Sequence, residues 1–286
     1  RVLRPFQVRD LGKVLALDNA ANFSVPGAGK TTVSLAAYEA ERALGRVDRL
    51  LVVAPLSAFE AWRDGVEDCF NGDKPTIQAV TDVVPDTEIV PVNYHRLGNR
   101  YAELARWVSS GKTMMLLDEA HRMKRGWDGQ FGSACLNMSL LATRRDILTG
   151  TPAPQSPSDL VALVDFLWPG QARRVLPRAA LASPPPPDAG SLVAAAIRPL
   201  FVRTKKSELE LRQPQMSVIQ VEPSELQAQI YAALRDRYAG AMNMSVVNRN
   251  RMARMGQIVM YLLEAATNPK LLAAGSGEQD QFRHPP

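Results

Sequence analysis

The amino-acid sequence predicts an α/β protein, with a parallel sheet flanked by helices and a mainly helical region after it. Residues 1–150 alternate short apolar runs with longer amphipathic stretches, the pattern of strands that alternate with helices. The apolar runs carry almost no polar residues. Strands have this composition when both faces of their sheet are covered, and such sheets are almost always parallel.

Each element follows from its own spacing. The short run at 22–25 precedes a glycine-rich turn, and the stretch from 32 to 44 has helical spacing. The compact run at 50–54 is β-like, and 58–70 is helical again. The remaining strands of this region are expected at 88–92, 113–117 and 145–148.

The pattern changes after Pro152. A helix is expected over 159–167 and ends at Pro169-Gly170, and 197–202 is interpreted as a last strand. The proline-rich segment 183–190 is interpreted as a surface loop, with a ligand for a proline-binding module as the alternative.

The end of the chain has a different character. The apolar spacing from 224 to 272 is helical, and the polar tail from 274 to 286 is expected to fray. We therefore expect a first domain at 1–205 and a helical extension at 206–286.

Composition excludes some classes of protein and favours others. The chain has 286 residues, of which 46% are hydrophobic and 22% charged, an ordinary globular balance. Its net charge of +5 suits a nucleic-acid partner, although a slightly basic protein without one would have the same charge. The two cysteines form no CxxC pair, and no apolar stretch reaches the ~20 residues of a membrane span. We expect a cytoplasmic protein with no membrane partner.

Two features of the sequence concern its source. It opens on Arg1 rather than Met, so we expect a piece of a longer protein. Ala, Arg and Pro are frequent, which favours a bacterial origin.

The segment Ser24-Val25-Pro26-Gly27-Ala28-Gly29-Lys30-Thr31 has the context of a phosphate-binding loop, between an apolar run and a helix. Gly27 and Gly29 let backbone N–H groups face an anion, and the following helix adds the positive end of its dipole. Lys30 is expected to reach the β- and γ-phosphates, and Thr31 to hold Mg²⁺. The full pattern has Gly at the position of Ser24, and the alternative is a plain glycine-rich turn.

Two carboxylates follow the strand expected at 113–117. In an open α/β sheet, Asp118 and Glu119 would lie beside the phosphate loop at the carboxyl ends of the strands. Asp118 is a candidate Mg²⁺ ligand, and Glu119 a candidate base that orients or deprotonates the attacking water. The alternative is a simple helix N-cap. A third segment, Thr149-Gly150-Thr151-Pro152, follows the strand expected at 145–148.

These segments, in this order, resemble those of the superfamily-2 helicase and translocase motors, most closely the Swi/Snf-type DNA translocases. Residues 27–31 match the family's motif I, and 118–121 match motif II in its DEAH form. The family usually has an acidic pair at the positions of Ser24 and Val25, so this chain is a divergent member.

The resemblance extends from Leu3 to about Leu272 and implies more of the nucleotide site. Leu3-Arg4-Pro5-Phe6-Gln7 resembles the adenine-recognition motif, which makes Gln7 the expected adenine contact, with Arg4 beside it. The remaining expected nucleotide-binding residues lie in or next to motif I: Gly27, Ala28, Gly29, Lys30, Thr31 and Thr32.

Five further segments resemble parts of the family: three that contact DNA or couple it to the ATP site, then the RRTK-type strand, and then the helix ending in Asn-His-Pro that precedes the second lobe. They are Ala54–Ser57 with Trp62 following, Asn93–Leu97, Thr149–Pro152 with Pro157–Leu160, Leu200–Lys206, and Leu263–Pro269. In the fourth segment Val202 stands where an Arg is common, and in the fifth the His of Asn-His-Pro is missing. Trp62 itself is expected to belong to the core.

Candidate contacts follow from these segments. Coupling between the ATP site and DNA is expected at His121, Thr149, Gly150 and Thr151. The candidate nucleic-acid contacts are Ser57, Arg63, Arg96, Lys124, Arg125, Arg203 and Lys205. Contacts of this kind go to the nucleic-acid backbone, so no preferred sequence is expected.

The resemblance implies an ATP hydrolase that uses Mg²⁺ and moves along double-stranded DNA. The family's motor has two RecA-like lobes, and the second lobe supplies arginine fingers to the ATP site. We expect residues 1–205 to be the first RecA-like lobe and 206–286 to lead toward the second. The chain alone is then nearly inactive, and further subunits of a larger complex are candidate partners.

Three other functions remain open at this stage. The first is the motor of an unwinding helicase or of a restriction or phage-defence complex. The second is an interaction module that binds nucleotide without hydrolysing it, for which the missing acidic pair gives some room. The third, a P-loop kinase or GTPase, is disfavoured by the DEAH segment and by 149–152.

Overall fold

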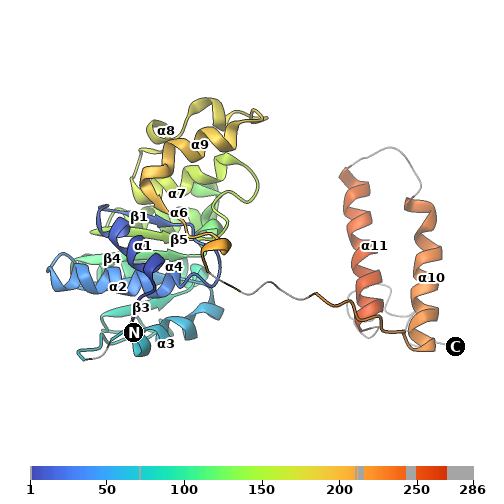
Figure 1. Ribbon diagram of the computed structural model, residues 1–286, viewed down its shortest axis with the longest axis horizontal. Helices are drawn as coiled ribbons and strands as arrows, with labels where there is room; N and C mark the ends of the chain where they lie inside the picture. Colours follow the sequence, from blue (N-terminus) through green and yellow to red (C-terminus); the bar gives the residue numbers. More distant parts are fainter. Residues whose placement is uncertain (1, 71, 210, 212–215, 243–248, 269–286) are drawn as a thin grey trace. The chain divides into compact units, whose positions relative to one another are not determined.

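The structure is a computed structural model, and it describes residues 2–70, 72–209, 211, 216–242 and 249–268, without the side chains of 237–255. The chain divides into two compact units, unit 1 at Arg1–Arg212 and unit 2 at Gln213–Pro286 (Figure 1). The domain boundary expected after residue 205 stays a prediction.

A parallel sheet forms the centre of unit 1. Its strands are β1 (Ala20–Asn22), β2 (Arg49–Val53), β3 (Ile89–Val92), β4 (Thr113–Asp118), β5 (Arg144–Leu148) and β6 (Phe201–Val202). They lie in the order β3-β2-β4-β5-β1-β6, and every pair in the described part is parallel. The expected fold class is confirmed.

The carboxyl ends of the strands are level with one another. Asn22 of β1 is paired with Leu148 of β5, and Leu148 with Asp118 of β4. On the other side of β4, Val53 at the end of β2 is paired with Leu117, and with Val92 at the end of β3. The segments that follow the strands therefore leave the sheet along one edge.

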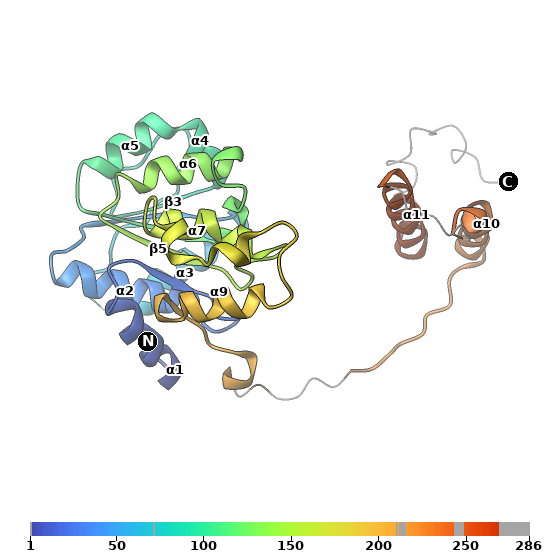
Figure 2. The ribbon, with the colours of Figure 1, turned by 90° about the horizontal axis from the view of Figure 1, so that it is seen from above.

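Helices cover both faces of the sheet. One face carries α1 (Pro5–Leu15), α2 (Lys30–Ala43) and α3 (Phe59–Cys69); the other carries α4 (Tyr94–Asn99), α5 (Tyr101–Ser109), α6 (Gln130–Ser139) and α7 (Leu160–Leu167). Figure 2 shows α1 and α2 on the opposite side of the sheet from α4, α5 and α6.

Strands β2, β3 and β4 are mostly apolar because they fill two cores. Leu50 and Val52 of β2 pack with α2 and α3, whereas Leu51 and Val53 pack with the helices of the other face. All four side chains are 0% exposed. Successive residues of a strand point to opposite faces, so a sheet covered twice needs an apolar residue at every position.

The last part of unit 1 corrects two expectations. Residues 197–202 are not one strand, because Ile197 ends helix α9 (Ala189–Ile197), a 3₁₀ turn follows, and only Phe201–Val202 is β6. Pro199 lies in that turn, and a proline has no N–H for a sheet ladder. The loop expected at 183–190 ends earlier, since Ala189 already begins α9; a short helix, α8 (Ala172–Val175), lies before it.

Unit 2 has two described helices, α10 (Glu225–Met242) and α11 (Arg249–Thr267). Their contact includes hydrogen bonds from Gln227 Nε2 to the carbonyls of Ala265 and Ala266, at 2.9 and 2.6 Å. The helical region expected at 224–272 is thus found in two pieces. Residues 243–248 and 269–272, and the tail expected at 274–286, lie outside the described residues. No helix of the described part is long and apolar enough to span a membrane.

A buried charge network joins α1, α2 and β5. Arg144 donates to the carbonyl oxygens of Val14 (2.9 Å) and Leu17 (3.0 Å) and pairs with Glu41 (3.2 Å) and Asp146 (3.2 Å). The side chains of Arg144, Glu41 and Asp146 are each only 5% exposed. Burial raises the pKa of Asp146, and the positive charge of Arg144 opposes this shift.

Arg144→Ala is therefore expected to lower the free energy of unfolding of unit 1 by about 3–5 kcal/mol, because two carboxylates lose a buried partner. The four tryptophans of the chain all lie in unit 1, so urea unfolding followed by tryptophan fluorescence reports on this unit. Arg106→Ala, at an exposed position of α5, is the control, with an expected change within about 0.5 kcal/mol. A loss for Arg144→Ala as small as that of the control would contradict the role of the network.

Candidate nucleotide and nucleic-acid site

Every segment singled out from the sequence in unit 1, except the one at the N-terminus, follows the carboxyl end of a strand. The phosphate loop follows β1, Ser57 follows β2, and Asn93–Arg96 follow β3; Asp118 ends β4 and Glu119 follows it, 149–152 follow β5, and Arg203 follows β6. The level strand ends place all of these segments along the same edge of the sheet.

The loop after β1 has the backbone of an anion site. Gly27 and Gly29 have φ values of +82° and +74°, a region that other residues rarely adopt. Helix α2 begins at Lys30, and no side chain caps its N-terminus, so its first N–H groups are available to an anion. Lys30 Nζ donates to the carbonyl oxygen of Ser24 at 3.1 Å, which brings the ammonium group across the loop.

Gln7 of α1 braces this loop. Its Oε1 accepts from the backbone N–H of Arg4 at 2.9 Å, and its Nε2 donates to the carbonyl oxygen of Ala28 at 3.3 Å. A Cβ at Gly29 would lie 2.3 Å from Gln7 Nε2 and 3.8 Å from Thr32 Oγ1. The expected adenine contact and the phosphate loop are thus neighbours, and glycine at position 29 is favoured by its positive φ.

A groove begins beside this contact and runs along α2. It has a volume of about 330 Å³. Its lining is mostly apolar: Leu3, Thr32, Leu35, Ala36, Glu39, Ala40, Ala43, Cys69 and Phe70. Leu3 lies in the segment expected to recognise adenine, and Thr32 directly follows the expected Mg²⁺ ligand Thr31.

The two carboxylates lie at the end of β4, where Asp118 is the last residue of the strand and Glu119 begins a constrained turn. Asp118 is partly buried, and burial raises the pKa of its carboxyl group, while a hydrogen bond from the indole of Trp62 opposes the shift. Glu119 has φ 51° and ψ 48°, the left-handed conformation. It is the one non-glycine residue with positive φ in the described part. Such a backbone persists only where the surroundings hold it.

His121 connects this turn to the segment after β5. Its Nδ1 lies 3.3 Å from Glu119 Oε2 and 3.1 Å from the hydroxyl of Thr149, which is fully buried. The same hydroxyl accepts from the backbone N–H of Thr151 at 3.2 Å. Gly150 lies against the phosphate loop, because a Cβ there would be 3.4 Å from Pro26 Cδ. Three of the residues expected to couple the sites therefore form one cluster, and the fourth contacts the loop.

Ser24, where the chain departs from the expected pattern, is bonded to the segment after β6. Its hydroxyl accepts from the backbone N–H of Thr204 at 2.8 Å, and the N–H of Val25 donates to the carbonyl of Thr204 at 3.1 Å. The hydroxyl of Thr204 donates to Asp10 Oδ2 (2.6 Å) and accepts from Arg9 Nη2 (2.8 Å). Ser24, Thr204 and Asp10 are all buried. Helix α1 and the segment after β6 therefore hold the first residues of the phosphate loop in place.

Thr204→Val keeps the shape of this side chain but removes both hydroxyl bonds. We expect the free energy of unfolding to fall by about 1–3 kcal/mol, because the Asp10 carboxylate loses a buried donor. Amide hydrogen exchange is expected to become faster in residues 23–28. Thr113→Val is the control: its hydroxyl is equally buried and donates to the carbonyl of Val108, far from the loop. Equal exchange in the loop of both variants would show that Thr204 does not anchor it.

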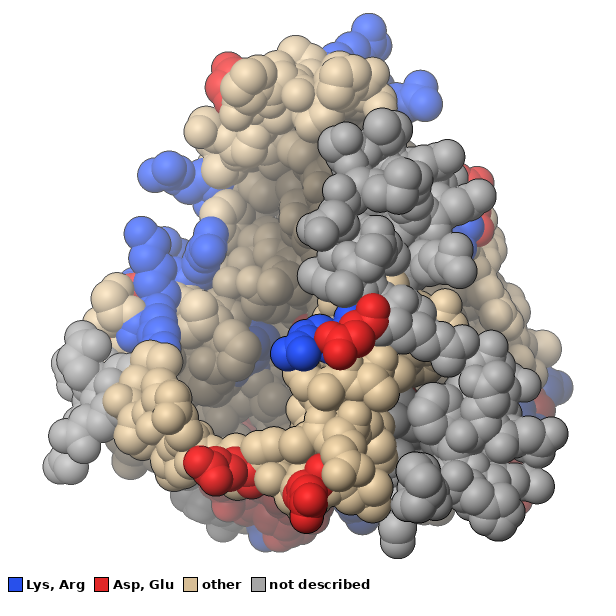
Figure 3. Space-filling model, turned by 90° about the vertical axis from the view of Figure 1, so that its right-hand side faces the viewer, with Lys and Arg blue, Asp and Glu red and all other residues tan. Residues whose placement is uncertain are grey.

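The candidate nucleic-acid contacts differ in exposure. Ser57, Arg63, Arg125, Arg203 and Lys205 are exposed, and Lys124 is half-buried. Arg96 is also half-buried, and its Nη1 donates to the carbonyl of Val80 at 2.6 Å, so its guanidinium already holds a loop in place. In the space-filling view, Lys and Arg side chains project at the left and at the upper right (Figure 3).

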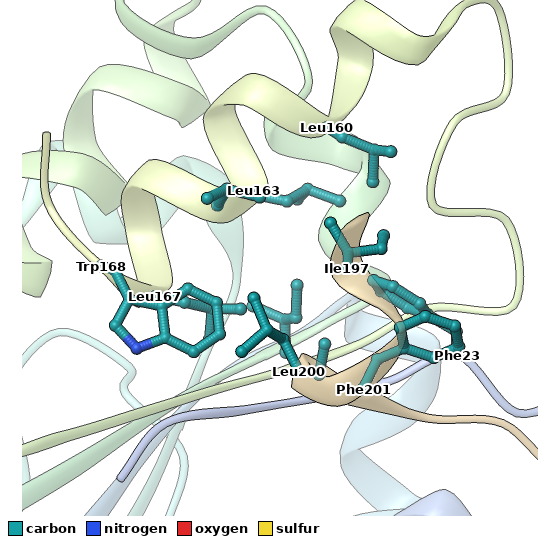
Figure 4. Close-up of a pocket in the computed structure, with 11 residues that line it drawn as sticks. Phe23, Leu160, Leu163, Leu167, Trp168, Ile197, Leu200 and Phe201 are labelled. Carbon is teal, nitrogen blue, oxygen red and sulfur yellow. The ribbon is translucent and has the colours of Figure 1, made fainter. Parts of the chain in front are cut away.

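A second cavity in unit 1 is packing rather than a site. Figure 4 shows apolar side chains of α7 facing those of Ile197, Leu200 and Phe201. The cleft between them leaves about 10 Å³, barely the room of one water molecule, and its lining offers no polar side chain other than the Trp168 indole.

The candidate residues suit Mg²⁺, which takes part of its ligand shell from phosphates and water, better than a metal ion whose ligands all come from protein side chains. No group of three or more His, Cys, Asp or Glu side chains that could hold a metal occurs among the described residues. Mg²⁺ usually takes one or two protein oxygens and completes its shell with phosphates and water. One partly buried carboxylate beside a phosphate loop with a threonine hydroxyl has this character.

Sequence reasoning missed three of the contacts at this edge. Trp62 was expected only in the core; it is fully buried, yet its Nε1 donates to Asp118 Oδ2 at 3.1 Å. Tyr94 donates its hydroxyl to the Asp118 carbonyl at 2.8 Å. The third contact is the pairing of Ser24 with Thr204. For Trp62 and Tyr94 the available signal was the residue type, since a buried indole or phenol usually finds a polar partner.

Comparisons with known proteins agree with this geometry. A family model described as the SNF2-related domain matches residues 25–271. Among solved structures, a Sulfolobus solfataricus SWI2/SNF2 ATPase core in complex with dsDNA is similar, with 18% identity and a TM-score of 0.60; 96% of this chain and 60% of that chain are covered. The core domain from the same organism gives 21% identity and a TM-score of 0.62, with 96% and 59% covered. This chain thus spans about three fifths of both structures, and at these identities the likeness shows the fold.

Proposed function

We propose, starting from the fact that this chain belongs to the SNF2-related domain family, that it is the ATP-binding lobe of a motor that moves along double-stranded DNA. The proposal rests on the observation that the candidate residues lie along one edge of the sheet. There the phosphate loop, the Asp118–Glu119 turn and the cluster of His121 and Thr149 are joined by direct contacts.

In this proposal, the loop from Gly27 to Gly29 and the first turn of α2 bind the phosphates, and Lys30 leaves the Ser24 carbonyl to pair with them. Thr31 and Asp118 hold Mg²⁺, which supplies positive charge to the phosphate oxygens. Glu119 orients or deprotonates the attacking water. The different partners of the two carboxylates support this division of roles, because Asp118 accepts from Trp62 whereas Glu119 lies beside His121.

The base of the nucleotide is proposed to lie near Gln7 and Arg4, at the start of the groove along α2. Gln7 has an amide that offers both a donor and an acceptor, which the edge of adenine requires. In the structure this amide bridges Arg4 and Ala28, so base binding would compete with the brace on the phosphate loop. The apolar lining of the groove suits a flat ring.

The His121 cluster is proposed to transmit the state of the ATP site to the nucleic-acid contacts. Glu119, His121 and Thr149 form a continuous chain of polar contacts, and Gly150 touches the phosphate loop. Backbone phosphates would be held by Ser57, Arg63, Arg96, Lys124, Arg125, Arg203 and Lys205. Such contacts make binding independent of sequence and weaker at high salt.

Hydrolysis is proposed to need a second RecA-like lobe that supplies arginine fingers, which are worth about 10³-fold or more in rate. The 286-residue chain is then expected to bind Mg·ATP weakly and to hydrolyse it very slowly. The test is phosphate release by this chain with and without duplex DNA, beside the same measurement on a protein that carries both lobes. Rapid DNA-stimulated turnover by the chain alone would contradict this part of the proposal.

Movement on duplex DNA has its own test in the two-lobe protein. We expect ATP-dependent displacement of a triple-strand-forming oligonucleotide from duplex DNA, with no separation of the duplex strands. Strand separation would indicate an unwinding helicase, and nucleotide binding with no hydrolysis in any form would indicate a silent interaction module. Stimulation by RNA alone would also contradict the proposal.

A further inference from the structure

The carboxylate of Asp118 is held by one donor on each oxygen. Trp62, on α3, donates its Nε1–H to Oδ2 at 3.1 Å, and the backbone N–H of Glu119 donates to Oδ1 at 3.0 Å. Two donors in fixed directions set the rotation of a carboxylate. Each oxygen keeps a further lone pair for another ligand.

The backbone of the same residue is held by a phenol. Tyr94, the first residue of α4, is 3% exposed and donates its hydroxyl to the carbonyl oxygen of Asp118 at 2.8 Å. That carbonyl belongs to the peptide between Asp118 and Glu119. Tyr94 therefore restrains the link between the two acidic residues, at the point where the backbone turns left-handed.

Packing alone does not account for the Trp62 contact. Trp62 lies in the core between α2, α3 and the sheet, where an apolar ring would fill the same space. The buried indole N–H of Trp107, by contrast, has no hydrogen-bond partner among the described residues. The N–H of Trp62 is instead directed from the α3 side of the sheet to the end of β4, onto the carboxylate beside the phosphate loop.

We propose that Trp62 and Tyr94 are positioning residues that hold Asp118 in the geometry that binds Mg²⁺. This inference rests on the proposed function, because it takes Asp118 as a ligand of the nucleotide-bound ion. Donors to a metal-binding carboxylate typically change metal affinity by about 10- to 100-fold when they are removed.

The two donors also connect Asp118 with the proposed nucleic-acid surface. Exposed Arg63 directly follows Trp62 on α3, and Arg96 lies on α4, the helix that Tyr94 begins. A nucleic acid that shifts α3 or α4 would move a group bonded to Asp118. Duplex DNA is therefore expected to change the Mg²⁺ dependence of nucleotide binding through these two side chains.

The test measures binding of a fluorescent ATP analogue to the 286-residue chain over a series of Mg²⁺ concentrations and in EDTA. Trp62→Phe is expected to raise the Mg²⁺ concentration for half-maximal tight binding by about 10- to 100-fold. Tyr94→Phe is expected to raise it less, since it acts on the backbone. Binding in EDTA should remain within about twofold of the unsubstituted chain, because the phosphate loop is unchanged.

Two control variants remove an indole N–H and a tyrosine hydroxyl at positions away from Asp118. Trp107→Phe deletes a buried indole N–H that has no partner, and Tyr38→Phe deletes a buried hydroxyl that donates to the Asp48 carbonyl. Both are expected to leave the Mg²⁺ dependence unchanged, whatever they do to thermal stability. If Trp62→Phe does not fold, Tyr94→Phe tests the positioning role by itself.

The outcomes separate the inference from the proposed function. If the unsubstituted chain binds no nucleotide, the proposed function fails. If it binds nucleotide and Trp62→Phe and Tyr94→Phe keep the Mg²⁺ dependence of the controls, the positioning role is overturned. The same titrations are repeated with duplex DNA. The link to nucleic acid is overturned if DNA leaves the Mg²⁺ dependence of the unsubstituted chain unchanged, or if it changes that of Trp62→Phe by the same amount.

Discussion

Glu119→Gln is expected to lower the rate of ATP hydrolysis by about 10²- to 10⁴-fold in the protein that carries both lobes, because the amide does not accept a proton from water. ATP binding is expected to persist, since the proposed phosphate and Mg²⁺ contacts come from other residues. Gln also fits the left-handed turn about as well as Glu, so the backbone stays in place. DNA-stimulated phosphate release measures the rate, and nucleotide fluorescence measures binding.

Glu60→Gln provides the control for this substitution. Glu60 is exposed in the first turn of α3 and lies outside the proposed site. Its expected rate is that of the unsubstituted protein. A Glu119→Gln protein that hydrolyses ATP at a similar rate would show that another group activates the water.

Lys30→Ala is expected to weaken nucleotide binding by the 286-residue chain by about 10- to 100-fold, the value of a charge-assisted hydrogen bond of 1.5–3 kcal/mol. Lys30 bonds to the Ser24 carbonyl in the structure, so its ammonium group already lies across the loop that would hold the phosphates. Binding of a fluorescent ATP analogue in titration is the measurement.

Lys112→Ala is the matched control for Lys30→Ala, at a site remote from the phosphate loop. Lys112 also donates its Nζ to a backbone carbonyl, that of Gly45, at 2.8 Å. Only the loss at Lys30 is expected to affect nucleotide binding. Equal affinity in the two variants would contradict the assignment of residues 24–31 as the phosphate loop.

The sequence determined the fold class because each strand carries the evidence for it. Apolar residues at every position of 50–54 and of 114–117 predicted strands covered on both faces, and the structure confirms a parallel sheet with two cores. The family was also predicted, from motifs in a fixed order, and is confirmed. The functional roles given to Lys30, Asp118 and Glu119 stay predictions.

Several helices were not predicted from the sequence, and α6 illustrates the reason. Helix α6 contains Gly132, a residue that weakens a helix, and its spacing gives no clear signal. In the structure a Cβ at this position would lie 2.1 Å from the Gly126 carbonyl oxygen, so close packing requires the glycine. Tertiary contact, rather than local preference, selected the residue.

The sequence by itself therefore determined four of the strands, those near 50–54, 88–92, 113–117 and 145–148, together with the loop that has the glycines of an anion site and the carboxylates at the end of a strand. Only the tertiary structure decided which distant residues support them. Ser24 meets Thr204 because β6 pairs with β1, and Trp62 meets Asp118 because α3 packs against β2 and β4. Spacing along a chain encodes local conformation, whereas these contacts depend on the order of strands in the sheet, which brings together residues far apart in the sequence.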